Sequence, residues 1–200
     1  MMRISKEFAE ILGLLCAEGS HIVSFSSYWG KERGKLYYRN NKKSERIEFY
    51  NKDKKLLHHY ADLLCKEFCM KTKVTKFGKI NIGKREIMTK IITQTPLGHM
   101  RWRVPKAISL GTKAVKIAFL RGYFDGDGTA ITCPRMFSTN RAGLRQVSQL
   151  LSSLNFKHTL QGPHYKEKRK PAYTIQISRK DKERFLNLIR PVSKKLGLRG

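Results

Sequence analysis

The sequence predicts an α+β fold of two pseudo-symmetric αββαββα repeats that pack through one helix from each repeat. Two segments with the same plan, residues 11–19 and 120–128, carry this prediction. Each is an apolar helical run that ends in an acidic residue followed by glycine, and the acidic residues Glu18 and Asp127 are 109 positions apart (18 to 127). Such a repeat in a chain of 200 residues indicates an internal duplication.

Small residues on one face of each segment predict that the two helices touch. Gly13 and Ala17 in the first segment are four positions apart, as are Gly122 and Gly126 in the second, so each pair shares a helix face. Two backbones can approach closely where side chains are missing. A glycine inside a helix costs about 1 kcal/mol relative to alanine, so a packing role is needed to offset it. The packed pair would bring the two acidic residues together at one end.

At these residues the sequence resembles the paired motifs of the LAGLIDADG homing endonucleases, in the single-chain form with two repeats. The matching residues are Leu12, Gly13, Leu14, Ala17 and Gly19 in the first motif, and Leu120, Gly122, Asp125, Asp127 and Gly128 in the second. The resemblance covers most of the chain. It implies a β-saddle on duplex DNA with the motif helices as its axis. We expect an N-terminal repeat over residues 1–95, a linker over 96–112 and a C-terminal repeat over 113–200.

The charge of the chain indicates a polyanionic partner. Lys and Arg number 42 against 15 Asp and Glu, a formal net charge of +27 that opposes folding through self-repulsion. A membrane surface is the alternative, and it is disfavoured because the charge is spread along the chain and no apolar run approaches transmembrane length. The four cysteines lack the second close pair that a zinc ribbon needs, which favours free thiols. No signal peptide is visible, so we expect an intracellular protein.

Hydrophobic periodicity predicts the elements of the first repeat. Apolar residues at helical spacing predict the motif helix over residues 5–18 and an amphipathic helix over 53–68. Alternation predicts a half-buried strand over 21–28, with Val23 and Phe25 on its inner side. Further strand segments are expected at 35–40, 46–50, 73–77, 79–82 and 86–93.

The second repeat is predicted to follow the same order. Its motif helix is expected over 113–126, with Gly128 in the left-handed conformation that ends many helices. A short hairpin over 129–138 and a helix over 141–153 come next. The last elements are strands at 157–161 and 172–178 and a helix at 180–192.

One sheet face in each repeat is expected to hydrogen-bond to DNA. Arg and Lys can read guanine edges, Gln can read adenine, and Ser or Thr can serve several bases. The predicted DNA-binding residues are Ser24, Ser26, Tyr38, Arg46, Glu48, Lys73, Thr75, Lys90, Lys157, Thr159, Gln161, Thr174 and Gln176, with Lys168 and Arg169 in a basic loop between the last two strands. The alternative is a solvated sheet face, and the large excess of Lys and Arg argues against it.

Glu18 and Asp127 are the predicted catalytic and metal-binding residues. Two carboxylates held close together repel unless cations lie between them, and hard divalent cations take carboxylate oxygens as ligands. The resemblance implies Mg²⁺ as the cofactor, with Mn²⁺ able to substitute and Ca²⁺ able to bind without supporting cleavage. It also implies that the backbone carbonyls of Ala17 and Gly126 help to hold the metals. The position of Asp125 favours a capping or interface role.

The family also places polar or basic groups near the metals to orient solvent. By position, the candidates are Asn51 and Lys52 at the start of one helix and Thr139, Asn140 and Arg141 at the start of another. Of these, Asn51, Lys52 and Asn140 are included among the predicted catalytic residues. A helix cap or a plain surface residue is the alternative at each position.

The resemblance thus implies a monomeric, sequence-specific endonuclease that cuts both DNA strands across the minor groove and leaves short 3′ overhangs. One strand of about eight residues in each half spans a target of roughly 16 base pairs in total, which would be long and asymmetric. No intein splicing motifs flank the motifs, which favours a free-standing protein that promotes intron homing. The alternative is an intron-RNA maturase or a non-cleaving DNA-binding regulator on the same scaffold, and the presence of both carboxylates argues against it.

Overall fold

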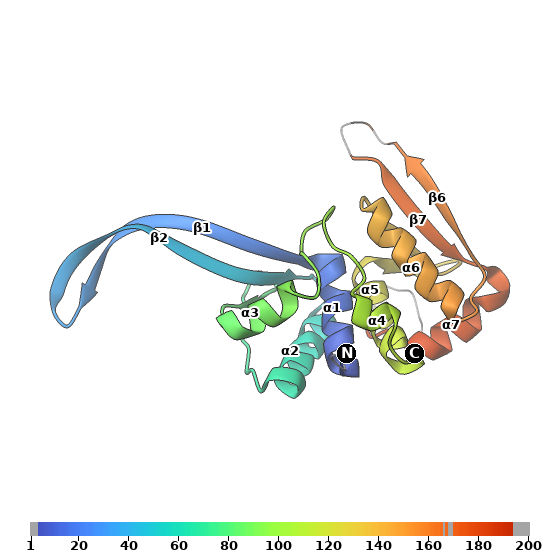
Figure 1. Cartoon of the computed structure of the whole chain (residues 1–200), viewed down its shortest axis with the longest axis horizontal. Helices are drawn as coiled ribbons and strands as arrows, with labels where there is room; N and C mark the ends of the chain where they lie inside the picture. The colour runs from blue at the N-terminus through green and yellow to red at the C-terminus, as the bar shows by residue number, and fades with distance from the viewer. Residues whose placement is uncertain (1–3, 166, 168–169, 194–200) are drawn as a thin grey trace.

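The computed structural model describes residues 4–165, 167 and 170–193 (Figure 1). The first half contains α1 (Lys6–Glu18), β1 (Gly19–Glu32), β2 (Lys35–Tyr50), α2 (Lys54–Phe68), β3 (Lys79–Ile82) and α3 (Arg85–Ile92). The second half contains α4 (Lys106–Ser109), α5 (Lys113–Asp127), β4 (Gly128–Thr129), β5 (Arg135–Ser138), α6 (Arg141–Ser153), β6 (His158–His164), β7 (Ala172–Ile177), the 3-10 turn η1 (Arg179–Asp181) and α7 (Lys182–Ile189).

Each half has one antiparallel sheet. The strand order is β1-β2-β3 in the first sheet and β4-β5-β7-β6 in the second. The helices α1 and α5 lie side by side between the two sheets (Figure 1). The predicted α+β class is therefore confirmed. Every helix in the described part of the chain is too short or too polar to cross a bilayer.

The helices α1 and α5 meet backbone to backbone at their glycines. A Cβ atom added at Gly13 would collide with the carbonyl oxygen of Phe119, and one added at Gly122 would collide with the carbonyl oxygen of Glu10. The predicted contact through small residues is confirmed. Close approach of the two backbones explains why both helices keep a residue that weakens helices.

The glycine after α5 serves a different purpose from the one predicted. Gly128 has φ −96° and ψ 164°, which is extended backbone, so the expected left-handed conformation is wrong. A Cβ atom at this position would collide with the carbonyl oxygen of Phe124 and lie 2.5 Å from its ring. Gly128 is therefore required by a close contact as the chain turns from α5 into β4.

Two predicted strands of the first half are not strands. Residues 73–77 are irregular, and residues 86–93 fall largely in α3. The β-branched residues of this segment suggested a strand, but Ile87, Met88 and Ile91 are buried at helical spacing. The first half therefore reads αββαβα, with a single strand, β3, following α2.

The hairpin of β1 and β2 is longer than predicted. Its strands have 14 and 16 residues, and it projects well beyond the helices (Figure 1). Because the helices cover only its base, Val23 and Phe25 are 43% and 62% exposed. The predicted half-buried strand is therefore wrong over its outer part.

A bulge in β2 changes which residues share a face of this hairpin. Between the pairs Ser26–Lys42 and Tyr28–Arg39, β1 advances by two residues and β2 by three, and Asn41 there has φ 50°. Beyond the bulge Tyr38 pairs with Trp29, which lies on the same side of β1 as Phe25. The prediction that grouped Tyr38 with the serines of β1 is therefore wrong.

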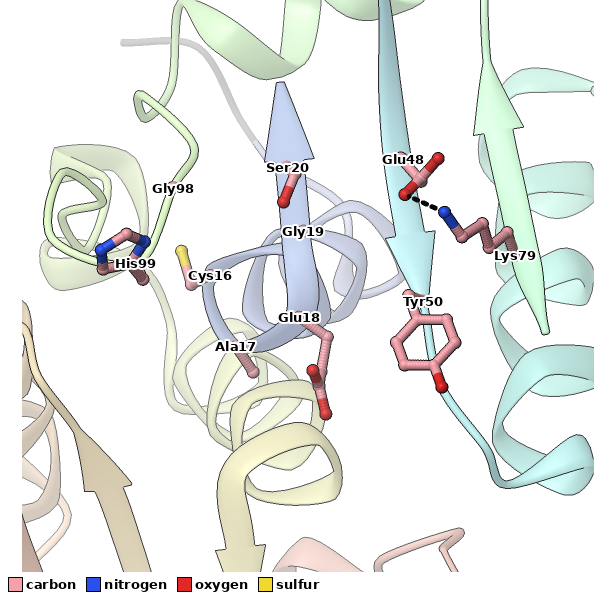
Figure 2. Close-up of a pocket in the computed structure, with 10 residues that line it drawn as sticks. All are labelled: Cys16, Ala17, Glu18, Gly19, Ser20, Glu48, Tyr50, Lys79, Gly98 and His99. Atoms are coloured by element: carbon pink, nitrogen blue, oxygen red, sulfur yellow. Dashed lines mark ion pairs between the residues drawn. The ribbon is translucent and has the colours of Figure 1, made fainter. Parts of the chain in front are cut away.

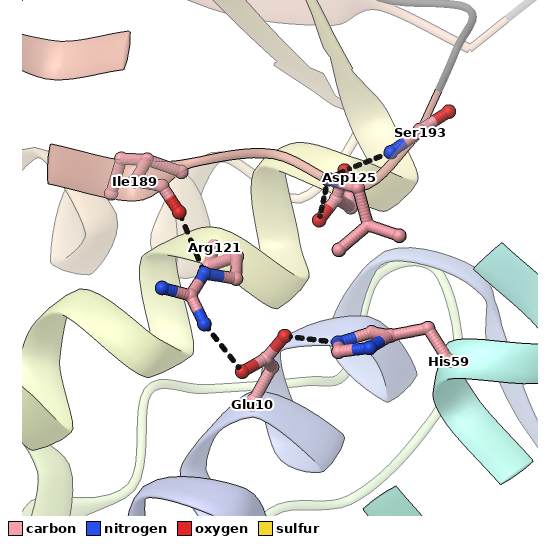
Figure 3. Close-up of polar contacts among 7 residues, drawn as sticks. Glu10, His59, Arg121, Asp125, Ile189 and Ser193 are labelled. Carbon is pink, nitrogen blue, oxygen red and sulfur yellow. Dashed lines mark hydrogen bonds and ion pairs between the residues drawn. The ribbon is translucent and has the colours of Figure 1, made fainter. Parts of the chain in front are cut away.

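A buried ion network joins the two halves at the end of α1 away from the acidic motif residues (Figure 3). Glu10 on α1 is 4% exposed, and one of its oxygens lies 2.6 Å from Nε2 of His59 on α2. Its other oxygen accepts a hydrogen bond of 3.2 Å from Arg121 on α5. Arg121 also donates to the carbonyl of Ile189 at the end of α7. Because a buried charge is stable only when it is paired, this network fixes the relative position of four helices.

Asp125 holds the segment after α7. Its Oδ1 accepts hydrogen bonds of 2.8 Å from the backbone N–H groups of both Val192 and Ser193 (Figure 3). Burial raises the pKa of the Asp125 carboxyl to about 6, although the two N–H donors act in the opposite direction. These contacts place Asp125 in the structural role that its position in the motif suggested.

Candidate active site

The acidic residues of the two motifs end neighbouring helices. Glu18 is the last residue of α1 and Asp127 is the last residue of α5, and both are half-buried. A Cβ atom added at Gly126 would collide with Cβ of Ala17 and would lie 3.3 Å from Cγ of Glu18. The Glu18 side chain therefore lies against the residue that immediately precedes Asp127. The helix pair brings the two carboxylate residues to the same end, as the sequence predicts.

Each carboxylate lines a hollow, and the two hollows are neighbours. Glu18 lines one together with Ser20, Glu48, Tyr50 and Lys79 (Figure 2). The residues of the other hollow are Ala17, His99, Trp102, Asp127, Phe137, Ser138, Thr139 and Ala172. Ala17 and His99 line both, so the hollows meet at the ends of the helix pair.

Asn51 is the auxiliary residue that the fold brings to a carboxylate. It is 4% exposed, and its Nδ2 donates a hydrogen bond of 3.2 Å to Oε1 of Glu18. Its own Oδ1 accepts from the backbone N–H of Asp53, and its backbone N–H donates to Gly78. Two hydrogen bonds of the side-chain amide and one of the backbone thus fix Asn51, which orients the Glu18 carboxylate.

The other auxiliary candidates occupy different surroundings. Asn140 is buried as the N-cap of α6, where its Oδ1 accepts from Gly143 and its Nδ2 donates to the carbonyl of Trp102. This is the capping alternative left open by the sequence. Lys52 is exposed and lines a separate hollow beside α2 with Thr75. The predicted catalytic roles of Lys52 and Asn140 therefore gain no support from their positions.

His99 is a site residue that the sequence analysis missed. It comes from the linker, between α3 and α4, and it lies beside Cys16 and Ala17 in Figure 2. Its Nε2 is 2.9 Å from Nζ of Lys170, which precedes β7. Sequence spacing could not reveal His99, because only the folded path of the linker places it over both hollows.

The negative charge at the end of α5 acts on a buried tyrosine. Burial, and secondarily the charge of Asp127, raise the pKa of Tyr123 well above its usual value. The neutral hydroxyl donates a hydrogen bond of 3.0 Å to the carbonyl of Phe137. Tyr123 therefore anchors β5 to α5 directly below the Asp127 hollow.

The donor set fits a divalent cation that is shared with a substrate. Among the described residues no group of three or more His, Cys, Asp or Glu side chains could hold a metal ion alone. Mg²⁺ usually keeps several waters and binds through one or two carboxylates together with substrate phosphates. Glu18 and Asp127, with the carbonyls of Ala17 and Gly126, offer that kind of incomplete site.

The open face of the first sheet leads to the Glu18 hollow. Strand pairing puts Ser24 opposite Ser44 and Ser26 opposite Lys42, and the alternation along β2 puts Arg46 and Glu48 on the same side. Glu48 also lines the Glu18 hollow and forms an ion pair of 2.9 Å with Lys79. Most of the predicted contacts on this sheet therefore share one surface with the site.

Two residues of the first half lie away from that surface. Lys90 is on α3, where its Nζ is 2.9 Å from Glu67 and lies over the rings of Phe8 and Phe68. The prediction that placed it on a sheet face is wrong, because the segment is a helix. Lys73 lies in the irregular segment before β3. Thr75 is in the same segment, and its hydroxyl accepts from the backbone N–H of Lys79.

The open face of the second sheet leads to the Asp127 hollow. Thr159, Gln161 and Gln176 lie on the side opposite the buried Ile175 and Ile177. Lys157 precedes β6, and its backbone N–H donates to Asp181. Phe137, which lines the Asp127 hollow, pairs with Thr174 on this same side.

Two features of this second face differ from the prediction. Thr174 is only 7% exposed, so its predicted contact with DNA is wrong for the surface as folded. Arg135, which was missed, donates a hydrogen bond of 2.8 Å to Oε1 of Gln176 and adds a cation to the face. The remaining predicted contacts, Lys168 and Arg169, lie outside the described residues.

Comparison with known proteins identifies the fold. Residues 114–190 match the family model of the LAGLIDADG-like domain. The homing endonuclease I-DmoI superposes with a TM-score of 0.65 and 23% identity over 92% of this chain and 94% of that one. The family model covers most of the second half of the chain, and the whole chain has the LAGLIDADG fold. The resemblance stated from the two motifs is confirmed.

Two further structures have the LAGLIDADG fold in complex with DNA. I-DmoI with DNA and Ca gives a TM-score of 0.67 at 22% identity, covering 98% of this chain and 97% of that one. I-SmaMI bound to an uncleaved DNA target in the presence of calcium gives 0.54 at 14% identity, covering 98% and 88%.

A curated relative was also found by sequence. It is a DNA polymerase of Thermococcus hydrothermalis, which is 28% identical over 161 residues, or 77% of this chain. The chain spans only 8% of that protein's length. The relative therefore contains a segment similar to this LAGLIDADG chain within a much longer polypeptide.

Proposed function

We propose that this protein is a site-specific, divalent-metal-dependent endonuclease that cuts both strands of a long, asymmetric DNA target. One observation carries the proposal. Two basic, hydrogen-bonding sheet faces, one from each half, run up to two adjoining hollows that each contain one motif carboxylate. The fold that this chain shares with I-DmoI is seen bound to DNA and Ca in that protein.

The two sheets would bind the DNA. A β-ribbon fits the major groove, and its side chains read base edges there. In the first half, Ser24, Ser26 and Arg46 present hydrogen-bonding groups on one side, and in the second half Thr159 and Gln161 do so. Because the two faces carry different side chains, they read different half-sites, which makes the target asymmetric. The net charge of +27 supplies the attraction to phosphates that does not depend on sequence.

Residues at the ends of α1 and α5 would carry out hydrolysis. Glu18 and Asp127 would hold the metal, with Mg²⁺ proposed and Mn²⁺ as a substitute. When bound, the cation supplies polarisation of the scissile phosphate and activation of a water molecule. Asn51 keeps the Glu18 carboxylate oriented through the hydrogen bond to Oε1. His99, which lines both hollows, presents a ring nitrogen to the entering backbone.

The position of the two cuts follows from the placement of the sheets on the duplex. With the sheets in the major groove on either side, the carboxylates would face the minor groove between the half-sites. One cut in each strand across that groove would leave short 3′ overhangs. A cut of this kind in an allele without the insertion is what promotes intron homing. The enzyme would act as a monomer, because one chain contains both halves of the site.

The decisive experiment removes each carboxylate separately. We expect Glu18→Gln and Asp127→Asn to bind target DNA with unchanged affinity while their cleavage rates with Mg²⁺ fall by at least about a hundredfold. Asp62→Asn, which removes an exposed carboxylate on α2, is the matched control and should cut like the wild type. Wild-type cleavage by both motif variants would overturn the metal assignment. Tight binding by the wild type without nicking in Mg²⁺ or Mn²⁺ would instead identify a binding protein.

A further inference from the structure

The back of the long hairpin exposes an apolar and aromatic surface on the side away from the proposed duplex-binding face. We define the outer hairpin face as Val23, Phe25, Trp29, Leu36 and Tyr38, with Lys31 and Lys43 beside them. The five apolar members are 43% or more exposed; the most exposed are Leu36 at 66%, Trp29 at 65% and Phe25 at 62%. An exposed apolar patch of this size usually marks an interaction site.

This face is the reverse of the surface that leads to Glu18. Phe25 pairs with Lys43, whereas the neighbouring pairs Ser24–Ser44 and Ser26–Lys42 lie on the other side of the ribbon. Near the base of the hairpin the same side packs on the core through Ile47. Farther out no helix covers it, as Figure 1 shows. The outer hairpin face therefore stays open when the opposite side lies in a DNA groove.

The chemistry of this face matches unpaired nucleic-acid bases. Trp29 and Tyr38 form an aromatic pair with ring centroids 5.3 Å apart, and Phe25 adds a third ring on the same side. Lys31 lies opposite Leu36, and Lys43 lies opposite Phe25, where its Nζ is also 3.1 Å from the Glu45 carboxylate. Surfaces that bind single strands combine aromatic rings for stacking with cations for the backbone.

Charge distinguishes this occupant from the others. Residues 23–45 contain six basic residues and two acidic residues, Glu32 and Glu45, so the hairpin has a net positive charge. Two copies of such a surface would repel each other, so a second molecule of this protein fits poorly. An intact duplex fits poorly as well, because its bases are stacked on one another and offer no free ring faces at its sides. A single strand offers both negative charge and free ring faces.

We propose that the outer hairpin face binds an unpaired nucleic-acid strand by stacking bases on Phe25, Trp29 and Tyr38. Four residues of β-strand separate Phe25 from Trp29, which is about 13 Å. That length accommodates about four stacked bases, so a probe of about ten nucleotides is long enough. The occupant is defined by its unpaired bases, which RNA and a DNA strand separated from its complement both offer, and the test below distinguishes the two.

Trp29 allows the proposal to be tested directly in the full chain. The protein has two tryptophans: Trp29 is 65% exposed on the outer hairpin face, whereas Trp102 is 1% exposed and lines the Asp127 hollow. Any change in Trp102 emission is measured in the Trp29→Leu variant and subtracted. We expect a single-stranded ten-nucleotide RNA or DNA to quench this emission, whereas a duplex of 40 base pairs binds without quenching it. The RNA and DNA probes have the same sequence, so the more strongly bound of the two identifies the source. The Trp29→Leu variant should lose the quenched signal.

A matched pair of phenylalanine variants completes the test. Phe25→Ala should weaken single-strand binding about tenfold and leave duplex binding unchanged. Phe77→Ala removes an equally exposed ring, 67% against 62%, that lies on the loop before β3, and it should change single-strand binding less than twofold. Equal effects of the two variants would overturn the proposal. Quenching by the duplex would overturn it as well, as would emission that changes with protein concentration alone, which would indicate self-association.

Discussion

The side chain of Asn51 donates a hydrogen bond of 3.2 Å to Oε1 of Glu18. It links the start of the α2 segment to the end of α1 and fixes one oxygen of the proposed metal ligand. Asn140 occupies a similar place before α6, but it caps that helix and bonds to a backbone carbonyl. The two halves thus use the same residue type for different tasks.

This difference gives a first prediction. Asn51→Ala should lower the cleavage rate about tenfold, the cost of one lost hydrogen bond to a charged group, and raise the Mg²⁺ concentration needed for half-maximal cleavage. Asn140→Ala should destabilise the fold by about 1 kcal/mol through the lost cap and leave the Mg²⁺ requirement unchanged. Thermal unfolding and Mg²⁺ titrations of cleavage measure both effects. An equal Mg²⁺ shift in the two variants would contradict the distinction.

His99 should matter for cleavage more than for binding. Its ring lies at the junction of the two hollows, where a scissile phosphate would enter. Removing one hydrogen bond to a charged group in His99→Ala should slow cleavage about tenfold, with target affinity changed less than threefold. Met100→Ala, which removes the next side chain of the linker, is the control for general disturbance of this loop. Single-turnover kinetics separate the two effects, and identical rates in both variants would refute the assignment.

The glycine contact between the helices predicts a stability effect. Gly122→Ala places a Cβ atom against the carbonyl oxygen of Glu10, so the backbones must move apart, at a cost of about 2 kcal/mol. That corresponds to a melting temperature about 4–8 °C lower. Gly83→Ala adds a methyl group where no atom lies within 4 Å and should be neutral. Calorimetry of the two variants provides the comparison, and an unchanged melting temperature for Gly122→Ala would contradict the packing.

Asp125 predicts a pH dependence of stability. Burial raises its pKa from 3.8 to about 6 in the folded state, and the nearby Glu10 adds to the rise. The folded state therefore holds the proton more tightly than the unfolded state does. Stability from this group is fully present below pH 3.8 and is lost as the pH rises through about 6, by about 3 kcal/mol in all.

Asp125→Asn removes that titration. Both N–H donors reach Oδ1, so the amide oxygen of asparagine can keep both bonds. The difference in unfolding free energy between wild type and variant should change across pH 4–6 and be flat above pH 7. Taking the difference cancels the contributions of groups that are the same in both proteins. Parallel stability curves throughout this range would refute the buried, protonated carboxyl.

The sequence predicted the helix pair and its carboxylates because those features depend on local spacing. The positions of Gly13 and Gly122 within their helices are enough to predict a close contact. The shared location of Glu18 and Asp127 is predicted by where each helix ends. The errors have another origin. The segment 86–93 is rich in β-branched residues, but it forms a helix that buries Ile87, Met88 and Ile91 on one face. Tyr38 changed faces because of one extra residue in β2, and His99 entered the site through the path of a linker. Such outcomes depend on tertiary contacts, which periodicity does not encode.

The reciprocal contact of Gly13 with Phe119 and of Gly122 with Glu10 limits how the two halves can change over time. Each glycine faces a backbone carbonyl on the opposite helix. A larger residue on one side therefore cannot be compensated by changing a side chain on the other, because the clash is with the backbone. Recombination with a half from a distant relative should succeed only when the incoming motif helix also has glycine on its contact face. The sheets, which are the proposed DNA-reading surfaces, have no such constraint. Target preference can therefore diverge while the contact between α1 and α5 stays unchanged.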